Sequence, residues 1–257
     1  MQATPLLGIR SIEKRFGGLT ALADVSLSIN HSEIYGLIGP NGAGKTTLFN
    51  VLTGFCAPER GDFQFNGESL LGCKPYRVAE SGIARTFQNI RLFGNMTAME
   101  NVMVGRHVRT KAGAIGAVLR TRQTKLEEAA IRSRSRELLD YVGIGAHAHI
   151  VSHNLSYGDQ RRLEIARALA TEPKLLALDE PAAGMNATET VALRRLLEQI
   201  RSDGVTILLI EHDVKLVMGL CDRVAVLDYG RKIAEGPPAQ VQSDPGVIRA
   251  YLGGALP

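Results

Sequence analysis

Short apolar runs recur along the chain, separated by longer segments with helical composition. Each run is nearly continuous in Val, Ile, Leu and Ala, which is typical of a strand covered on both faces. The alternation of such runs with helical segments predicts a mostly parallel sheet with helices packed against it. The four candidate strands are Glu33–Ile38, Leu175–Leu178, Val205–Ile210 and Val224–Leu227.

The N-terminal part has a different pattern, in which apolar and polar residues alternate. Ile9–Arg15, Val25–Ile29 and Phe63–Phe65 follow it. Such alternation is expected of antiparallel strands with one face on a core and the other in water. We therefore expect an N-terminal antiparallel β subdomain beside the parallel core sheet.

The middle of the chain, about residues 86–167, is predicted to be a helical subdomain inserted into the core. Within it, Thr121–Tyr141 contains neither Pro nor Gly, and Gly143 and Gly145 follow as helix stop signals. A glycine-containing connector at 113–116 precedes this helix, and its sequence indicates no role.

The C-terminal tail, residues 237–257, begins with a Pro-Pro pair and is also predicted to be helical. A short helix is expected over Pro245–Tyr251, because Ser243-Asp244 can cap it and Pro245 suits the first turn. The chain as a whole, 1–257, is predicted to be one α/β domain that carries these additions.

The most informative segment follows the first candidate strand and leads into a helical stretch. A G-x-x-x-x-G-K-[ST] loop in this strand–loop–helix context is a phosphate-binding P-loop. Its glycines permit positive φ, so that backbone N–H groups at a helix N-terminus can point at a polyphosphate. Lys45 is expected to reach the β- and γ-phosphates, and the Thr46 hydroxyl to ligate Mg²⁺. The predicted ATP-binding residues of this loop are Gly39, Pro40, Asn41, Gly42, Ala43, Gly44, Lys45, Thr46 and Thr47.

Two adjacent carboxylates, Asp179 and Glu180, follow the apolar run Leu175–Leu178. At a strand end both side chains can reach one site. Alone, the pair would be interpreted as an acidic turn; beside a P-loop, the catalytic interpretation is favoured. Asp179 is then expected to hold Mg²⁺, directly or through water, and Glu180 to orient and deprotonate an attacking water.

A third pattern, Leu155-Ser156-Tyr157-Gly158-Asp159-Gln160, precedes a helical run. Ser156 is placed as an N-cap, with Asp159 three residues later in a capping-box position. A helix N-terminus with a Ser hydroxyl and a Gly N–H can also receive an anion. These residues alone do not decide between a well-capped helix and an anion receptor.

Composition and charge restrict the classes of function. The net charge is +4 and aromatic residues are 5%, with no Trp, so a nucleic-acid partner is not expected. No run approaches the roughly 18 apolar residues that span a bilayer, and the N-terminus lacks a secretory pattern. Cys56, Cys73 and Cys221 form no C-x-x-C and are expected to be reduced thiols in the cytosol.

Some polar residues carry weaker signals. His147, His149 and His153 cluster without a Cys or carboxylate at ligand spacing, which favours a solvated loop over a metal site. Asp222 and Asp228 flank an apolar run and are interpreted as turn residues.

Taken in order, these motifs resemble those of the ATP-binding subunits of ABC transporters, over essentially the whole chain. Leu155–Gln160 is similar to the family's L-S-G-G-Q signature, with Tyr157 at the first Gly position and an additional acidic residue, Asp159. Gln88 corresponds to the glutamine of the family's Q-loop, and His212 to its switch histidine.

Two further segments match the same family. Phe16 corresponds to the aromatic residue that stacks on adenine. Ala183, Gly184, Met185 and Asn186 match the D-loop. Six motifs in the correct order make the resemblance very specific.

The resemblance implies a P-loop NTPase fold of the ABC type that uses ATP and Mg²⁺. Two ATPase domains, identical or paralogous, then close head to tail, and each ATP lies between the P-loop of one and the signature of the other. Gln88 would join Thr46 and Asp179 around Mg²⁺ and link the ion and the attacking water to the helical insertion, so the resemblance implies Glu180, His212 and Gln88 as the catalytic residues. His212 would contact the γ-phosphate and steady Glu180. The signature residues acting on the partner's ATP would be Ser156, Tyr157, Gly158, Asp159 and Gln160.

Some segments resemble one subfamily, the larger ATPase subunit of branched-chain amino acid importers. Met185 departs from the Leu usual there and is similar to the related urea importers, which leaves the cargo open. The segments that carry this resemblance are Arg85–Phe93, Met96-Thr97, Glu100–Val102, Ser156–Arg167 and Val247–Gly253.

The implied assembly has two ATPases, two transmembrane permease subunits and, indirectly, a periplasmic binding protein. The chain would then lie at the cytoplasmic face of the bacterial inner membrane, peripheral through the permeases. Alternatives from the same family are a urea or amide importer ATPase, a lipopolysaccharide-export ATPase, and a soluble ABC ATPase of iron–sulfur assembly. Identification of the partner proteins would distinguish the importer from these alternatives.

Overall fold

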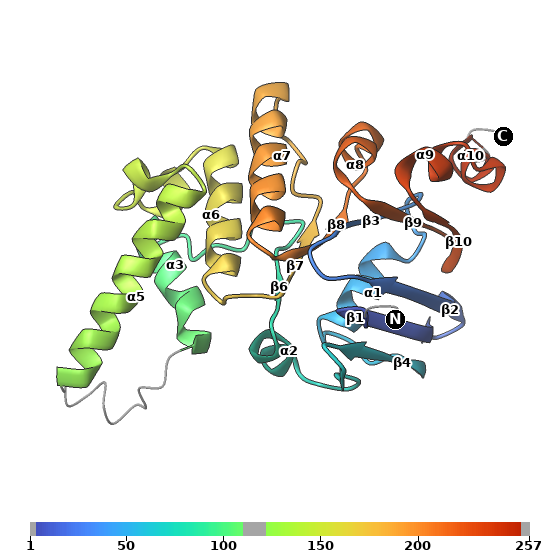
Figure 1. Cartoon of the computed structure of the whole chain (residues 1–257), viewed down its shortest axis with the longest axis horizontal. Helices are drawn as coiled ribbons and strands as arrows, with labels where there is room; N and C mark the ends of the chain where they lie inside the picture. Colours follow the sequence, from blue (N-terminus) through green and yellow to red (C-terminus); the bar gives the residue numbers. More distant parts are fainter. Residues whose placement is uncertain (1–3, 110–121, 253–257) are drawn as a thin grey trace.

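The computed structural model describes residues 4–109 and 122–252 (Figure 1). The connector at 113–116, the predicted helix start at Thr121 and the last five residues of the tail lie outside the described residues. In the described part, no helix is both long and apolar enough to cross a bilayer.

The core is a six-stranded sheet of order β10-β9-β3-β8-β7-β6, in which β3, β8, β7, β6 and β9 run parallel and β10 is antiparallel to β9. All four strands expected in this sheet are present, with ends that differ by one residue or so, so the predicted parallel core is confirmed. β6 and β10 were not predicted. The strands are β3 (Ile34–Ile38), β6 (Ile83–Arg85), β7 (Leu175–Asp179), β8 (Thr206–Ile210), β9 (Arg223–Asp228) and β10 (Arg231–Gly236).

A second sheet, of order β2-β1-β4-β5, is antiparallel throughout and confirms the predicted N-terminal β subdomain. Its inner side chains, such as Ile9 and Phe63, share one buried cluster with Leu208 of the core sheet and Leu48 of helix α1. Helix α1 therefore lies between the two sheets, which fixes the loop that precedes it. The elements are β1 (Leu7–Phe16), β2 (Leu19–Ile29), β4 (Arg60–Phe65), β5 (Glu68–Ser69) and α1 (Lys45–Leu52).

Helices pack on the other side of the core sheet and extend away from it (Figure 1). Met99, Leu139 and Leu163, one each from α3, α5 and α6, belong to a second buried cluster that continues into the core sheet. The predicted long helix is confirmed where it is described. The helices on this side are α3 (Ala98–Arg106), α5 (Arg122–Tyr141), α6 (Tyr157–Leu169), α7 (Ala187–Ser202), α8 (Val214–Leu220), α9 (Pro238–Gln242) and α10 (Pro245–Leu252). Helix α2 (Pro75–Ser81) lies on the side of α1, where its Val78 belongs to the first cluster.

Side-chain caps fix several helix starts. Thr97 and Glu100 form a reciprocal capping box at α3, and Asn186 and Glu189 form another at α7. At α10 the Asp244 carboxylate accepts the backbone N–H of residues 246 and 247, at 2.7 and 3.1 Å. The expected cap of the tail helix is thereby confirmed.

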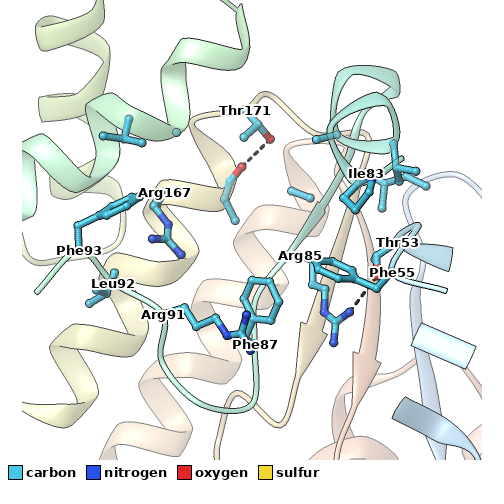
Figure 2. Close-up of a pocket in the computed structure, with 17 residues that line it drawn as sticks. Thr53, Phe55, Ile83, Arg85, Phe87, Arg91, Leu92, Phe93, Arg167 and Thr171 are labelled. Carbon is cyan, nitrogen blue, oxygen red and sulfur yellow. Dashed lines mark hydrogen bonds between the residues drawn. The ribbon is translucent and has the colours of Figure 1, made fainter. Parts of the chain in front are cut away.

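A groove of 720 Å³ opens where the helical part meets the core (Figure 2). Thr53 and Phe55 line it from the core side, whereas Phe93 and Arg167 line it from the helical side. Its surface is mostly apolar, with arginines among aromatic rings; the guanidinium of Arg91 lies 4.5 Å from the centre of the Phe87 ring.

Asp222, which the sequence indicated as a turn residue, also connects two elements of the core. Its Oδ2 accepts the N–H of Ile34 at 2.8 Å, and its Oδ1 accepts from Arg201 at 2.8 Å. Asp222 therefore ties the start of β3 to the end of α7. The sequence could not show this, because the three residues are far apart along the chain.

We predict that Asp222→Ala lowers the free energy of unfolding by about 1–3 kcal/mol, because a buried N–H loses its acceptor. Arg201→Ala is the matched control, since it removes only an exposed ion pair worth about 0–1 kcal/mol. Urea denaturation of the two variants measures the difference. Equal losses would show that the ion pair, not the Ile34 N–H, is what Asp222 supplies.

Candidate active site

Three site segments leave the core sheet at one edge. Strands β3, β8 and β7 are parallel neighbours, with Leu37 opposite Ile210 and Asp179 opposite Ile210. The loops that follow their carboxyl ends begin at Gly39, Glu180 and Glu211. In open parallel sheets this edge is where ligands bind.

The P-loop has the backbone form that its glycines were expected to allow. Gly44 is the N-cap residue of α1 with φ of 102°, and an added Cβ would lie 2.6 Å from the carbonyl oxygen of Ala21. A Cβ on Gly39, where φ is 149°, would lie 2.1 Å from the carbonyl oxygen of Leu227. Both positions therefore require glycine on steric grounds as well as conformational ones.

Lys45 lies on the inner side of this loop. Its ammonium donates to the carbonyl oxygens of Gly39 and Pro40, at 2.6 and 3.0 Å. Burial lowers the pKa of Lys45, and the nearby carboxylates of Glu180 and Asp179 act in the opposite direction.

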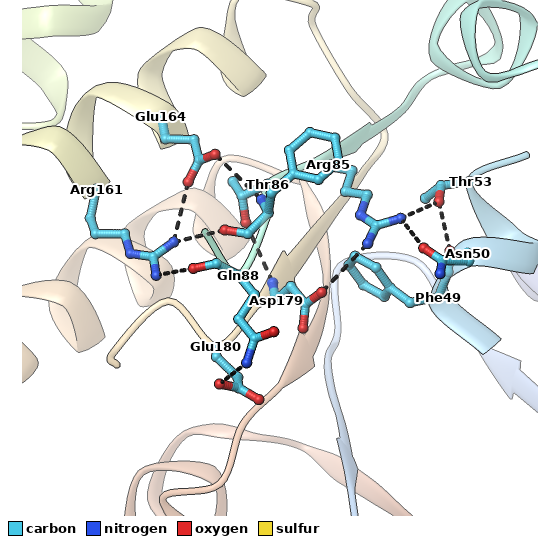
Figure 3. A network of polar contacts seen from close by, with 11 residues as sticks. Phe49, Asn50, Thr53, Arg85, Thr86, Gln88, Arg161, Glu164, Asp179 and Glu180 are labelled. Carbon is cyan, nitrogen blue, oxygen red and sulfur yellow. Dashed lines mark hydrogen bonds and ion pairs between the residues drawn. The ribbon is translucent and has the colours of Figure 1, made fainter. Parts of the chain in front are cut away.

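The Glu180 carboxylate is held between two side chains, His212 and Gln88, and Figure 3 shows the contact with Gln88. His212 Nε2 lies 2.6 Å from Oε1, and Gln88 Nε2 donates to Oε2 at 2.9 Å. Glu180 has φ of 50°, and its N–H donates to the carbonyl of Ile210 at 2.9 Å. The structure thus brings together the three residues that the sequence analysis expected to be catalytic.

Asp179 is the last residue of β7, directly before Glu180, and its side chain is buried. Its Oδ2 lies 3.5 Å from Nη2 of Arg85, whose Nη1 also donates to Asn50 and Thr53 (Figure 3). Burial raises the pKa of Asp179, the Arg85 charge lowers it, and the Glu180 charge raises it. The role of Arg85 was missed by the sequence analysis, because its partners are distant along the chain.

The P-loop lines a cavity of 430 Å³ together with Gln88, Glu180 and His212, whereas Asp179 is absent from the described lining. Phe16 lies at its edge with 52% of its surface exposed, and Tyr229, which the sequence analysis missed, is 86% exposed beside it. Exposed aromatic rings at the mouth of a polar cavity suit stacking on a planar base. The described lining residues are Phe16, Leu19, Thr20, Ala21, Asn41, Gly42, Ala43, Gly44, Lys45, Thr46, Thr47, Gln88, Glu180, His212 and Tyr229.

Ser156–Gln160 are absent from that described lining and lie at the N-terminus of α6. The Ser156 hydroxyl accepts the N–H of Asp159 at 3.2 Å, so it is the predicted N-cap. The reciprocal half of the expected capping box is not made; instead the Asp159 carboxylate faces His147, with Oδ2 3.4 Å from Nδ1. No group of three potential metal ligands occurs in the described residues, which include the three clustered histidines.

The D-loop packs against this same helix start. Gly184 has φ of 77°, and an added Cβ would lie 3.1 Å from the ring of Tyr157. A Cβ on Gly158 would lie 2.7 Å from Oε1 of Glu189, which belongs to the capping box with Asn186. The signature segment and the D-loop therefore form one surface.

Glu211 is a third residue whose role the sequence analysis missed. It is 4% exposed; its Oε1 accepts the N–H of Ala182 at 2.8 Å, and its Oε2 accepts the N–H of His212 at 3.1 Å. Burial raises the pKa of Glu211, whereas these N–H groups lower it. One carboxylate thereby fixes the start of the D-loop and the backbone of the histidine.

The fold and this site define a P-loop ATPase, with a glycine-rich phosphate loop and the Glu180 carboxylate at the same edge of the sheet. The family model for ABC transporters matches residues 22–183, and a model for branched-chain amino acid ATP-binding cassette transporters matches 231–256. The chain belongs to the ABC transporter family, as one of its ATP-hydrolysing subunits.

Individual relatives agree over the full length. The chain is 46% identical over 252 residues to the high-affinity branched-chain amino acid transport ATP-binding protein LivG of Escherichia coli, covering 98% of this chain and 99% of LivG. It is 43% identical over 252 residues to BraF of Pseudomonas aeruginosa, with the same coverage. A solved ATP-binding cassette of an ABC transporter in its ADP conformation has a TM-score of 0.85 at 31% identity, covering 98% of this chain and 100% of that one.

We predict that Glu211→Gln lowers the free energy of unfolding by about 1–3 kcal/mol, because one of two buried N–H groups then faces an amide NH₂. Since the His212 backbone or the D-loop must shift, the ATP hydrolysis rate is also expected to fall, by about tenfold. Urea denaturation and steady-state ATPase assays measure the two effects. Unchanged hydrolysis would show that Glu211 does not position His212.

Proposed function

We propose that this chain is the ATPase subunit of an importer for branched-chain or related amino acids. The observation that carries the hydrolytic part is the Glu180 carboxylate, held by His212 and Gln88 at the edge of the P-loop cavity. The cargo part is supported by the similarity to LivG and BraF and by the subfamily match at 231–256.

The phosphates of ATP would lie on the N–H groups of the P-loop, at the N-terminus of α1. Lys45 is already aligned along the inner side of this loop, so its ammonium can exchange a loop carbonyl for a phosphate oxygen. The adenine would stack on the exposed ring of Phe16.

The residues present suit Mg²⁺, which prefers oxygen ligands. The Thr46 hydroxyl and the Gln88 amide line the cavity, and Gln88 uses its nitrogen on Glu180, which leaves its oxygen for a cation. Asp179, at the end of β7, would hold the Mg²⁺ ion directly or through a water molecule. When bound, Mg²⁺ supplies charge neutralisation on the β- and γ-phosphates.

In the hydrolytic step a water attacks the γ-phosphorus and its proton passes to Glu180. The bond between the γ-phosphorus and the bridging oxygen breaks, and ADP leaves with the electron pair. Gln88 and His212 hold the carboxylate in place, so that its orientation costs nothing at the moment of reaction.

A second ATPase chain, identical or paralogous, completes the site. Ser156 and Gly158, which lie outside the chain's own cavity, would then receive the partner's γ-phosphate at the N-terminus of α6. Residues 86–167 would move as the helical subdomain, and the permeases would dock in the groove of Figure 2. The chain would thereby lie peripherally at the cytoplasmic face of the membrane.

We expect Glu180→Gln to reduce ATP turnover by about 10²–10⁴-fold, the usual contribution of a positioned base, while ATP binding persists. The variant should also trap the ATP-bound dimer, which size-exclusion chromatography would detect. Lys45→Ala is the contrasting variant, because loss of a charge-assisted contact weakens ATP binding itself by about 10–100-fold. Hydrolysis at the wild-type rate by Glu180→Gln would remove Glu180 from the role of base.

The importer assignment is tested by affinity purification of the tagged chain from detergent-solubilised native membranes. We expect two multi-span permeases and a second, shorter ABC ATPase. Recovery of lipopolysaccharide-export components or of soluble partners alone would overturn the importer assignment and leave the ATPase.

A further inference from the structure

Arg161 is a buried charge that the proposed mechanism does not use. It lies on α6, five residues after Ser156, and is 3% exposed. Its guanidinium donates to the carbonyl oxygens of Phe87 and Gln88, at 2.8 and 2.5 Å (Figure 3). A residue of the signature helix therefore holds the backbone of the loop that carries Gln88.

Glu164, one helical turn later, holds the same loop from its donor side. Its Oε1 accepts the N–H groups of Phe87 and Arg91, at 3.4 and 3.3 Å, and its Oε2 lies 3.4 Å from Nη1 of Arg161. Arg161 and Glu164 thus provide hydrogen-bond partners for both carbonyl and N–H groups of the loop that carries Gln88. This loop has no regular secondary structure that would supply such partners.

The guanidinium also reaches the signature segment itself. Nη2 of Arg161 donates to the Tyr157 hydroxyl at 3.0 Å, and the Tyr157 ring covers Gly184 of the D-loop. One side chain therefore contacts both the segment that faces a partner's nucleotide and the loop whose glutamine holds Glu180.

We propose that Arg161 is a positioning residue that couples the signature segment to Glu180 through Gln88. This inference rests on the proposed function. Displacement of the signature segment by the partner's nucleotide moves Arg161, and the Gln88 amide moves with it. Each chain's own hydrolysis then depends on its contact with the partner's ATP.

The arrangement differs from an ion pair that only fills space. A buried pair is weak evidence of stabilisation, since apolar residues often replace one without loss. Two convergent carbonyls, however, need the planar fork of Arg, which the point charge of Lys does not reproduce. Arg161→Lys therefore keeps the charge and removes the fork.

A double-mutant cycle on the full-length chain tests the proposal, with Arg161→Lys, Gln88→Ala and the double variant in steady-state ATPase assays. We expect Arg161→Lys to lower kcat about tenfold with little change in KM for ATP, because the P-loop contacts are untouched. In the Gln88→Ala background, Arg161→Lys should lower kcat less than twofold, because the amide through which Arg161 affects Glu180 is absent.

Arg162→Lys is the matched control, being the next residue on the same helix and facing Gly143 rather than Gln88. It should leave kcat within about twofold in both backgrounds. If Arg161→Lys does not fold, Tyr157→Phe replaces it in the cycle. Tyr157→Phe removes only the hydroxyl that Arg161 contacts. It should lower kcat about threefold in the wild-type background and leave kcat unchanged in the Gln88→Ala background.

The outcomes separate the inference from the function on which it rests. Effects of Arg161→Lys and Gln88→Ala that multiply in the double variant would overturn the coupling while leaving the ATPase assignment intact. A tenfold rise in KM with kcat unchanged would also overturn it, because Arg161 would then act on binding. Absence of ATP hydrolysis in the wild-type chain would refute the proposed function, and the inference with it.

Discussion

The parallel pairing of β3, β8 and β7 is the constraint on which the rest of the site depends. These strands are buried along their whole length and place alternate side chains in the two clusters, so a slip of one residue would move each side chain from its own cluster into the other. With the register fixed, the ends of the three strands come level. The P-loop, the Asp179-Glu180 pair and the Glu211-His212 pair then leave the sheet side by side, although they lie far apart in the sequence.

The conformation of Glu180 shows how this constraint reaches the chemistry. A left-handed φ of 50° in a residue with a side chain costs about 1–2 kcal/mol and persists only where surrounding structure imposes it. Here the Glu180 N–H is held by the carbonyl of Ile210, the last residue of the strand that leads to His212. The same strand end thus turns the carboxylate toward the cavity and supplies the histidine that contacts it.

The sequence could predict what is encoded locally. Continuous apolar runs indicated the buried strands, and the glycines, Lys45 and the paired carboxylates indicated phosphate chemistry. β6 has three residues and β10 is a partly exposed edge strand, so neither gives a strong periodic signal. The positioning residues could not be predicted for another reason. Glu211 accepts the N–H of Ala182 and Arg161 donates to the carbonyl of Gln88, and no local sequence pattern links residues that only the fold brings together.

Two arginines, Arg161, which is buried, and Arg85, which is largely buried, hold the segment that carries Gln88. At its start, Arg85 is fixed by Asp179 and lies over the rings of Phe49 and Phe87, at 4.5 and 4.9 Å. At its centre, Arg161 holds the loop carbonyls from α6. In the described part of the chain the Nε atoms of both arginines are buried and have no hydrogen-bond partner within the protein.

Such a segment cannot drift independently of its anchors. Arg85 ties it to β7 at one end and Arg161 ties it to α6 at the other, while α1, which follows the P-loop, is packed between the two sheets. On the coupling proposed above, a displacement of the helical part would reach the active site as a displacement of the Gln88 amide relative to Glu180, and not as a change in the phosphate-binding loop. In the proposed mechanism, nucleotide binding and water activation would thereby be separated within one chain, so that an assembly could hold ATP before hydrolysing it.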